Sequence, residues 1–169
     1  MKHKSTLFLV LTILTAVMIF CFSAQDGEDS SALSGGLSVA VAKIIKPGFD
    51  QLPTVEQESL LSSLGFIIRK IAHFSEFALL GFNLAWYLLL RADKRAFPLR
   101  CCRLSWLLST LYAGTDELHQ MFVANRGPAI LDVGIDSCGA LFGVAVVYLL
   151  LPHRISLPPA ASWQRHNLL

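Results

Sequence analysis

Eight polar side chains suited to acid–base chemistry or hydrogen bonding interrupt three apolar stretches of this chain. His73 and Glu76 share one helical face in KIAHFSEFALLGF, and Asp132 and Asp136 lie in ILDVGIDSCGALFG. The stretch LYAGTDELHQMF holds the densest group, which consists of Asp116, Glu117, His119 and Gln120. Carboxylic acids and imidazoles are common general acids and bases. The seven ionisable residues are therefore candidate catalytic groups, and Gln120 is a candidate for binding substrate.

Spacing indicates which way the polar side chains of LYAGTDELHQMF would face. Asp116 shares a helical face with His119 and Gln120, whereas the adjacent Glu117 is turned by about 100°. We expect this glutamate to face a neighbouring helix or the rim of the site.

A pattern of small residues follows the two aspartates of ILDVGIDSCGALFG. Gly139 and Gly143 continue nearly the same stripe as Asp132 and Asp136. This GxxxG spacing lets a partner helix approach closely. The aspartate face is therefore expected to point into a helix bundle.

Basic residues flank these acidic groups. Arg69 precedes KIAHFSEFALLGF, Lys70 is its first residue, and Arg126 lies in the loop ANRGPA between LYAGTDELHQMF and ILDVGIDSCGALFG. All three are candidates for binding substrate, since such side chains hold phosphate or carboxylate groups. Imidazole combined with carboxylate also suits zinc or manganese. No HExxH motif is present, and the sequence leaves the metal and any other cofactor unassigned.

Long apolar segments carry the polar groups. Hydrophobic residues make up 54% of the chain and the mean hydropathy is +0.56, which favours a membrane protein. About 20 residues cross the hydrocarbon core, and they must be helical because lipid offers the backbone no hydrogen-bond partners. Four segments are long enough, namely Ser5–Ala24, Ile71–Leu90, Leu104–Val123 and Ile130–Leu151. We therefore expect an all-α, polytopic membrane bundle with four transmembrane helices.

The first of these segments has two interpretations. MKHK followed by a long apolar run and FSA is typical of a membrane anchor, and also of a signal peptide that is removed after Ala24. The apolar run is long for a signal peptide, and the FSA site is a mediocre cleavage site. These features favour retention as an anchor.

Basic residues near the ends of the spans predict the orientation. Lys2 and Lys4 precede the first span, Arg154 follows the fourth, and the loop RADKRAFPLRCCR joins the second and third. Cytoplasmic loops are enriched in lysine and arginine. We therefore expect a multi-pass protein of the cytoplasmic (inner) membrane with both termini in the cytoplasm.

The segment between the first two spans is then outside the membrane. Its first part, QDGEDSSALSGG, has the composition of a loop. Thr54 and Gln57 have the spacing of a capping box, and apolar residues recur at helical spacing from Leu60 onward, which predicts an outer amphipathic helix before the second span. The predicted units are a first anchor at 1–24, an extracytoplasmic loop with this helix at 25–70, a three-helix membrane core at 71–151 and a cytoplasmic tail at 152–169.

Alternating helix directions place all eight polar residues at one level. At about 1.5 Å of rise per residue, they fall within roughly 10 Å of the outer boundary. They would line a polar cup that opens outward. Residues that merely join one helix to another would give a similar pattern. However, an unpaired charge in hydrocarbon costs at least a few kcal/mol, and we interpret the cup as a functional site.

The sequence resembles the VanZ-like family of bacterial integral membrane proteins. RKIAHFSEFALLGF and YAGTDELHQMFVANRGPAILDVGIDSCGALFG carry the resemblance, which extends from about Leu7 to Leu151. It implies that the first span is retained. Many members have a Pro-Gly-Arg turn, and Asn125 departs from it. The change is mild, because Asn also tolerates turn geometry. The family's namesake is associated with resistance to the glycopeptide antibiotic teicoplanin. The implied motif residues are Lys70, His73, Glu76, Asp116, Glu117, His119, Gln120, Arg126, Asp132 and Asp136.

Two functional hypotheses remain open. The cup could modify a lipid-linked, anionic molecule of the cell envelope by acid–base or metal-assisted chemistry. It could instead bind an envelope ligand or an antibiotic without catalysis. The expected partners are the lipid bilayer and this substrate, and the net charge of +2 does not suggest nucleic acid. Transport is disfavoured, because the inner halves of the spans lack ionisable residues.

Overall fold

The computed structural model describes residues 2–25, 27–92, 98–124 and 129–151. Within these residues it contains five α-helices, one short 3-10 helix and no strand, so the predicted all-α class is confirmed. The helices are α1 (Lys2–Ser23), α2 (Gly27–Ile45), α3 (Thr54–Arg91), α4 (Pro98–Gln120) and α5 (Ile130–Leu150), and the 3-10 helix η1 is Phe49–Gln51.

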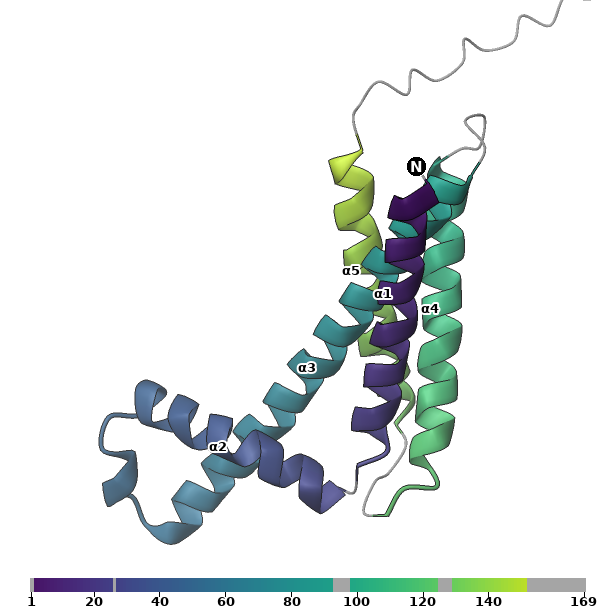
Figure 1. Cartoon of the computed structure of the whole chain (residues 1–169). Helices are drawn as coiled ribbons and strands as arrows, with labels where there is room; N and C mark the ends of the chain where they lie inside the picture. The colour runs from purple at the N-terminus through teal and green to yellow at the C-terminus, as the bar shows by residue number, and fades with distance from the viewer. Residues whose placement is uncertain (1, 26, 93–97, 125–128, 152–169) are drawn as a thin grey trace, which may run out of the picture.

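Four helix segments form an upright bundle (Figure 1). α1, the C-terminal half of α3, α4 and α5 follow one another in alternating directions, so that the start of α1, the end of α3, the start of α4 and the end of α5 lie at the same end. The N-terminal half of α3 leaves the bundle and crosses α2 to one side. The end of α1, the end of α4 and the start of α5 meet at the opposite end of the bundle, which we call the polar end.

The bundle has a small apolar core and extensive apolar outer faces. Ile19, Phe77, Leu80, Ala113 and Ala140 form a buried cluster at its centre. The outward faces of α1, α4 and α5 expose many large apolar side chains. Exposed apolar area of this extent is unusual for a soluble monomer and fits contact with lipid.

In the part of the chain that the structure describes, two helices have the length and composition needed to cross a membrane. They are His3–Ser23 and Ile130–Leu150. The predicted second span lies in α3 and most of the predicted third span lies in α4. Polar residues such as Glu76, Asn83 and Asp116 make these helices less apolar. The structure therefore supports a membrane protein, and the full count of four spans stays a prediction.

Glycines allow α3 and α5 to pack backbone against backbone. A Cβ atom on Gly143 would overlap with the carbonyl oxygen of Ala78. A Cβ atom on Gly139 would overlap with the carbonyl oxygen of Phe74, and Gly81 faces α5 in the same way. The GxxxG prediction is therefore confirmed, and α3 is the partner helix.

The prediction of a loop in QDGEDSSALSGG was wrong from Gly27 onward, because this sequence begins α2. Its small residues pack against another helix. A Cβ atom on Gly65 of α3 would lie 3.6 Å from Ser38 Oγ and 3.7 Å from Ser34 Oγ. The Ser38 hydroxyl donates to the Ser34 carbonyl at 2.8 Å, which satisfies it within α2. The small polar residues of this segment, which have the composition of a loop, thus allow α2 and α3 to cross at close distance.

The outer amphipathic helix and the second predicted span are one continuous helix. α3 has 38 residues and is therefore about 57 Å long. The boundary placed between 70 and 71 falls inside it. The capping-box prediction was also wrong, because Pro53 is the N-cap residue and makes no side-chain cap. Gln57 instead donates to the Leu52 carbonyl at 2.9 Å.

Because α3 and α5 are in contact at Gly143, a larger side chain at this position is expected to lower the stability of the protein strongly. We expect Gly143→Val to lower the free energy of unfolding in detergent by more than about 3 kcal/mol or to prevent folding, because the neighbour is backbone that has little freedom to move. Gly134→Ala, on the same helix with nothing within 4 Å of its added Cβ, is the control and should be tolerated. Equal stability of the two variants, measured by circular dichroism during denaturation, would contradict this packing.

Candidate functional site

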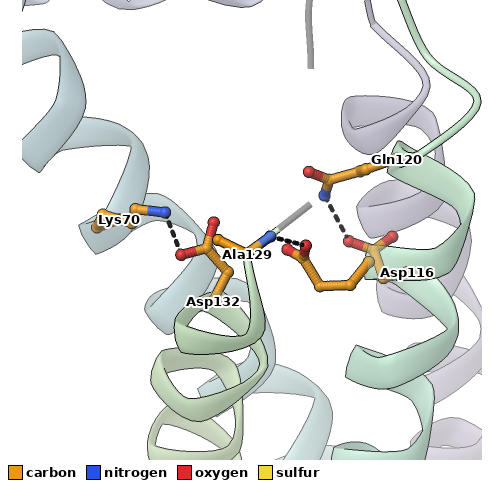
Figure 2. Close-up of polar contacts among 6 residues, drawn as sticks. Lys70, Asp116, Gln120, Ala129 and Asp132 are labelled. Atoms are coloured by element: carbon orange, nitrogen blue, oxygen red, sulfur yellow. Dashed lines mark hydrogen bonds and ion pairs between the residues drawn. The ribbon is translucent and has the colours of Figure 1, made fainter. Parts of the chain in front are cut away.

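A hydrogen-bonded triad joins α1 to α4 at the polar end. Ser23 Oγ donates to Asp116 Oδ2 at 2.6 Å, and Gln120 Nε2 donates to the same oxygen at 2.9 Å (Figure 2). Gln120 Nε2 also lies 3.1 Å from Ser23 Oγ. All three side chains are buried. The predicted common face of Asp116 and Gln120 is therefore confirmed.

Ser23 is a member of the site that the motif residues do not include. Serine is common in apolar helices because its hydroxyl can bond to the preceding turn. A single serine at the end of the first span gives little signal by type alone. The available indication was its position at the outer end of the predicted span Ser5–Ala24.

Glu117 and Asp132 connect the start of α5 to α4 and α3. The backbone N–H of Ala129 donates to Glu117 Oε2 at 3.0 Å, which satisfies a donor next to the first turn of α5. Lys70 of α3 forms an ion pair with Asp132 (Figure 2). Glu117 thus faces the start of a neighbouring helix, in agreement with its predicted turn away from Asp116.

Asp136 is the most isolated acid of the cluster. Its side chain is 1% exposed, and neither of its oxygens accepts a hydrogen bond within the described part of the chain. The carboxyls of Asp116, Glu117 and Asp132 are close enough to repel it, and Lys70 partly offsets this repulsion. Burying such a group without partners costs several kcal/mol, so Asp136 makes no evident contribution to stability.

Glu76 lies near the triad without joining it. It is partly buried, and the charge of Asp116 acts on its carboxyl. No hydrogen bond links Glu76 to α4 among the described residues, so Asp116 acts on it only through its charge. Asp116 Oδ1 also remains without a hydrogen bond in this part of the chain. These two acids therefore have oxygens available for a ligand.

The two candidate histidines lie on different helices. His73 is partly buried on α3. His119 stacks against Phe20 of α1, with ring centroids 4.6 Å apart, and its Nδ1 has no hydrogen-bond partner within the described residues. The Phe20 ring thus covers one face of the His119 imidazole.

The predicted basic residues occupy different positions. Lys70 pairs with Asp132 and lies 5.0 Å from the centre of the Phe66 ring. Arg69 turns towards α2, where its NH1 donates to Ser34 Oγ at 3.3 Å. Arg126 lies outside the described residues, and its predicted place above the opening stays a prediction. Among the described residues, Lys70 is thus the basic side chain that forms an ion pair with the acidic cluster.

Several polar groups deeper in the bundle bond to one another, although the buried Ser109 Oγ has no hydrogen-bond partner among the described residues. The Tyr112 hydroxyl donates to the Ala16 carbonyl at 2.7 Å, and Asn83 Nδ2 lies 3.3 Å from Thr15 Oγ1. Ser137 and Thr110 share a hydrogen bond of 2.9 Å. These pairs hold helices together and have no excess charge. They contrast with the polar end, where oxygens of Asp116 and Asp136 are left over.

The arrangement suits proton transfer or ligand binding better than a preformed metal centre. No three described His, Cys, Asp or Glu side chains converge closely enough to hold a metal ion. The carboxyls of Asp116, Glu117, Asp132 and Asp136 instead lie close enough to influence one another, with the Lys70 ammonium group beside them. Such a set can accept hydrogen bonds from hydroxyl or amine groups and can exchange protons with them.

The chain belongs to the VanZ/LLP1 family, since a family model of that description matches residues 8–151. The match includes α1 from its second turn onward and all of the polar end. The predicted family is therefore confirmed. No curated protein and no solved structure matched the chain significantly.

Because their hydrogen bonds differ, the two buried aspartates are expected to contribute different amounts to the free energy of unfolding. Asp116→Ala leaves Ser23 and Gln120 without their acceptor and should lower the free energy of unfolding by about 1–3 kcal/mol. Asp136→Ala removes a carboxyl that has no such bonds and should cost at least about 1 kcal/mol less. Denaturant titration in detergent, followed by circular dichroism, measures both. A larger loss for Asp136→Ala would show that this residue is structural.

Proposed function

We propose that this VanZ/LLP1-family protein acts at the polar end of its bundle on a lipid-linked molecule of the bacterial cell envelope. The observation that carries the proposal is Asp136, a fully buried acid whose oxygens have no partner among the described residues. A group kept at such a cost is expected to serve a ligand or a reaction.

The proposed setting is a four-span protein of the bacterial inner membrane with both termini in the cytoplasm. Lys4 lies in the first turn of α1, Arg91 ends α3, and Arg100 and Arg103 lie in the first two turns of α4. These helix ends lie at the end of the bundle away from the polar end (Figure 1). This charge distribution supports a cytoplasmic location for that end. The polar end would then open towards the outer leaflet, where lipid-linked envelope precursors are displayed.

Retention of α1 is part of the proposal. Removal of the first span would take Ser23 away from Asp116 and Phe20 away from His119. The family match also begins inside α1. Both observations favour an anchor over a removed signal peptide.

The charges support a headgroup that combines hydroxyl or amine groups with phosphate. The carboxyls of Glu76, Asp116 and Asp136 can accept hydrogen bonds from the former. Lys70, with Arg69 and Arg126 as further candidates, can approach a phosphate. Lipid-linked saccharides have both features. In the catalytic version, Glu76 or His119 exchanges a proton with the headgroup while Asp136 and Lys70 orient it.

The triad favours a second candidate, a binding protein that performs no chemistry. Ser23, Asp116 and Gln120 hold one another in a fixed arrangement, which is what recognition of a polar headgroup requires. The ligand would then be an envelope lipid or a lipid-bearing glycopeptide such as teicoplanin, with which the family's namesake is associated.

Glu76→Gln tests the site while preserving the size of the side chain. Purified protein in vesicles should convert or retain a radiolabelled lipid-linked saccharide, and we expect Glu76→Gln to reduce the rate or the affinity by about a hundredfold. Glu56→Gln is the matched control on the same helix, where the glutamate is exposed and paired with Lys46; it should behave like the wild type. Turnover in the wild type indicates an enzyme, and retention without turnover indicates a binder. Full function in Glu76→Gln would reject the site.

A further inference from the structure

An apolar groove lies between α1 and α4 and extends towards the polar end. It has a volume of about 380 Å³ and is lined by Ile13, Ala16, Val17, Phe20 and Tyr112. It is open along one side. The groove is separate from the acids of the polar end, and the proposed function does not use it.

The groove exists because α1 packs against α3 more extensively than against α4. Ile19 of α1 is buried against Phe77 and Leu80 of α3. Towards α4, the Tyr112 ring stands between the helices and its hydroxyl donates to the Ala16 carbonyl at 2.7 Å. This side chain holds the two backbones apart, so that neighbouring positions leave open space.

The groove is continuous with the candidate site. Phe20 lines the groove and also stacks on His119, with ring centroids 4.6 Å apart. Ser23 follows on α1 and donates to Asp116. A ligand that leaves the groove beyond Phe20 would therefore meet the hydrogen-bonded triad.

The groove covers most of the depth of one leaflet. From Ile13 to Phe20 the helix rises by about 10 Å, compared with about 15 Å for half of the hydrocarbon core. A hydrocarbon chain can lie along this depth and leave its headgroup at the membrane surface. Apart from the Tyr112 hydroxyl, which donates to the Ala16 carbonyl, the side chains that line the groove are apolar.

We propose that this groove holds the hydrocarbon chain of a lipid while the headgroup of that lipid occupies the polar end. The inference rests on the proposed function and names the substrate class, a lipid recognised by both of its parts. A smaller cavity of about 170 Å³ between α4 and α5, lined in part by Cys102, Arg103 and Val144, does not adjoin the polar end and has no such continuity.

Photo-crosslinking in vesicles tests the groove directly. The probe is phosphatidylglycerol with a diazirine in its acyl chain, and crosslinked peptides are mapped by mass spectrometry. We expect labelling of α1 around Val17 and of α4 around Tyr112 to saturate with increasing probe. Val17→Trp should obstruct the groove and reduce this labelling by about tenfold. Leu14→Trp is the control on the same helix, outside the groove, with exposures of 58% for Leu14 and 53% for Val17; it should change labelling by less than about twofold.

Labelling that does not saturate, or that responds equally to both tryptophan variants, would overturn the inference and show bulk lipid contact only. Labelling concentrated at the cavity between α4 and α5 would also overturn it. Turnover or retention of the radiolabelled lipid-linked saccharide separates the test of the proposed function from this one, because it reports on the polar end, whereas crosslinking around Val17 reports on the groove. Saturable labelling together with a fully active Asp136→Asn variant would leave the groove in place and reject the role proposed for Asp136.

Discussion

The close packing of α3 against α5 is the constraint on which the polar end depends. Glycine at three contact points lets the two backbones touch, and this contact fixes how far one helix can slide along the other. The resulting contacts follow both helices in the same order, as Lys70 with Asp132, Phe74 with Gly139, and Ala78 with Gly143. A shift by one helical turn, about 5.4 Å, would separate the ion pair and move Asp136 away from the other acids.

Around this contact, the polar groups divide according to whether their hydrogen bonds are complete. Deeper pairs such as Tyr112 with Ala16 are satisfied and join helices in surroundings that offer no water. At the polar end, Ser23 and Gln120 fill one oxygen of Asp116, while Asp136 has no hydrogen-bond partner among the described residues. Among the described residues, the buried carboxyl oxygens without a hydrogen bond thus lie at the polar end, whereas Ser109 Oγ is an unpaired hydroxyl deeper in the bundle. The apolar groove beside the polar end gives a membrane-embedded ligand a route to it.

The sequence allowed the bundle and the polar end to be predicted, because span length, GxxxG spacing and the depth of charged residues depend on local pattern. It did not reveal α2, since Ser34 and Ser38 have the composition of a loop and serve a helix crossing only once Gly65 is placed beside them. The continuity of α3 was also missed, because a change from amphipathic to apolar pattern resembles a boundary. Ser23 was missed because a lone serine acquires its role only from the distant Asp116.

In the proposed function, acids from different helices serve one site, and a double-mutant cycle distinguishes this arrangement from separate roles. Binding of a radiolabelled lipid-linked saccharide to vesicles would be measured for Glu76→Gln, Asp136→Asn and the variant that combines them. If both residues act on one headgroup, each single variant weakens binding and the combined loss in free energy departs from the sum of the two by more than about 0.5 kcal/mol. Losses that simply add, or binding unchanged in all three variants, would contradict a shared site.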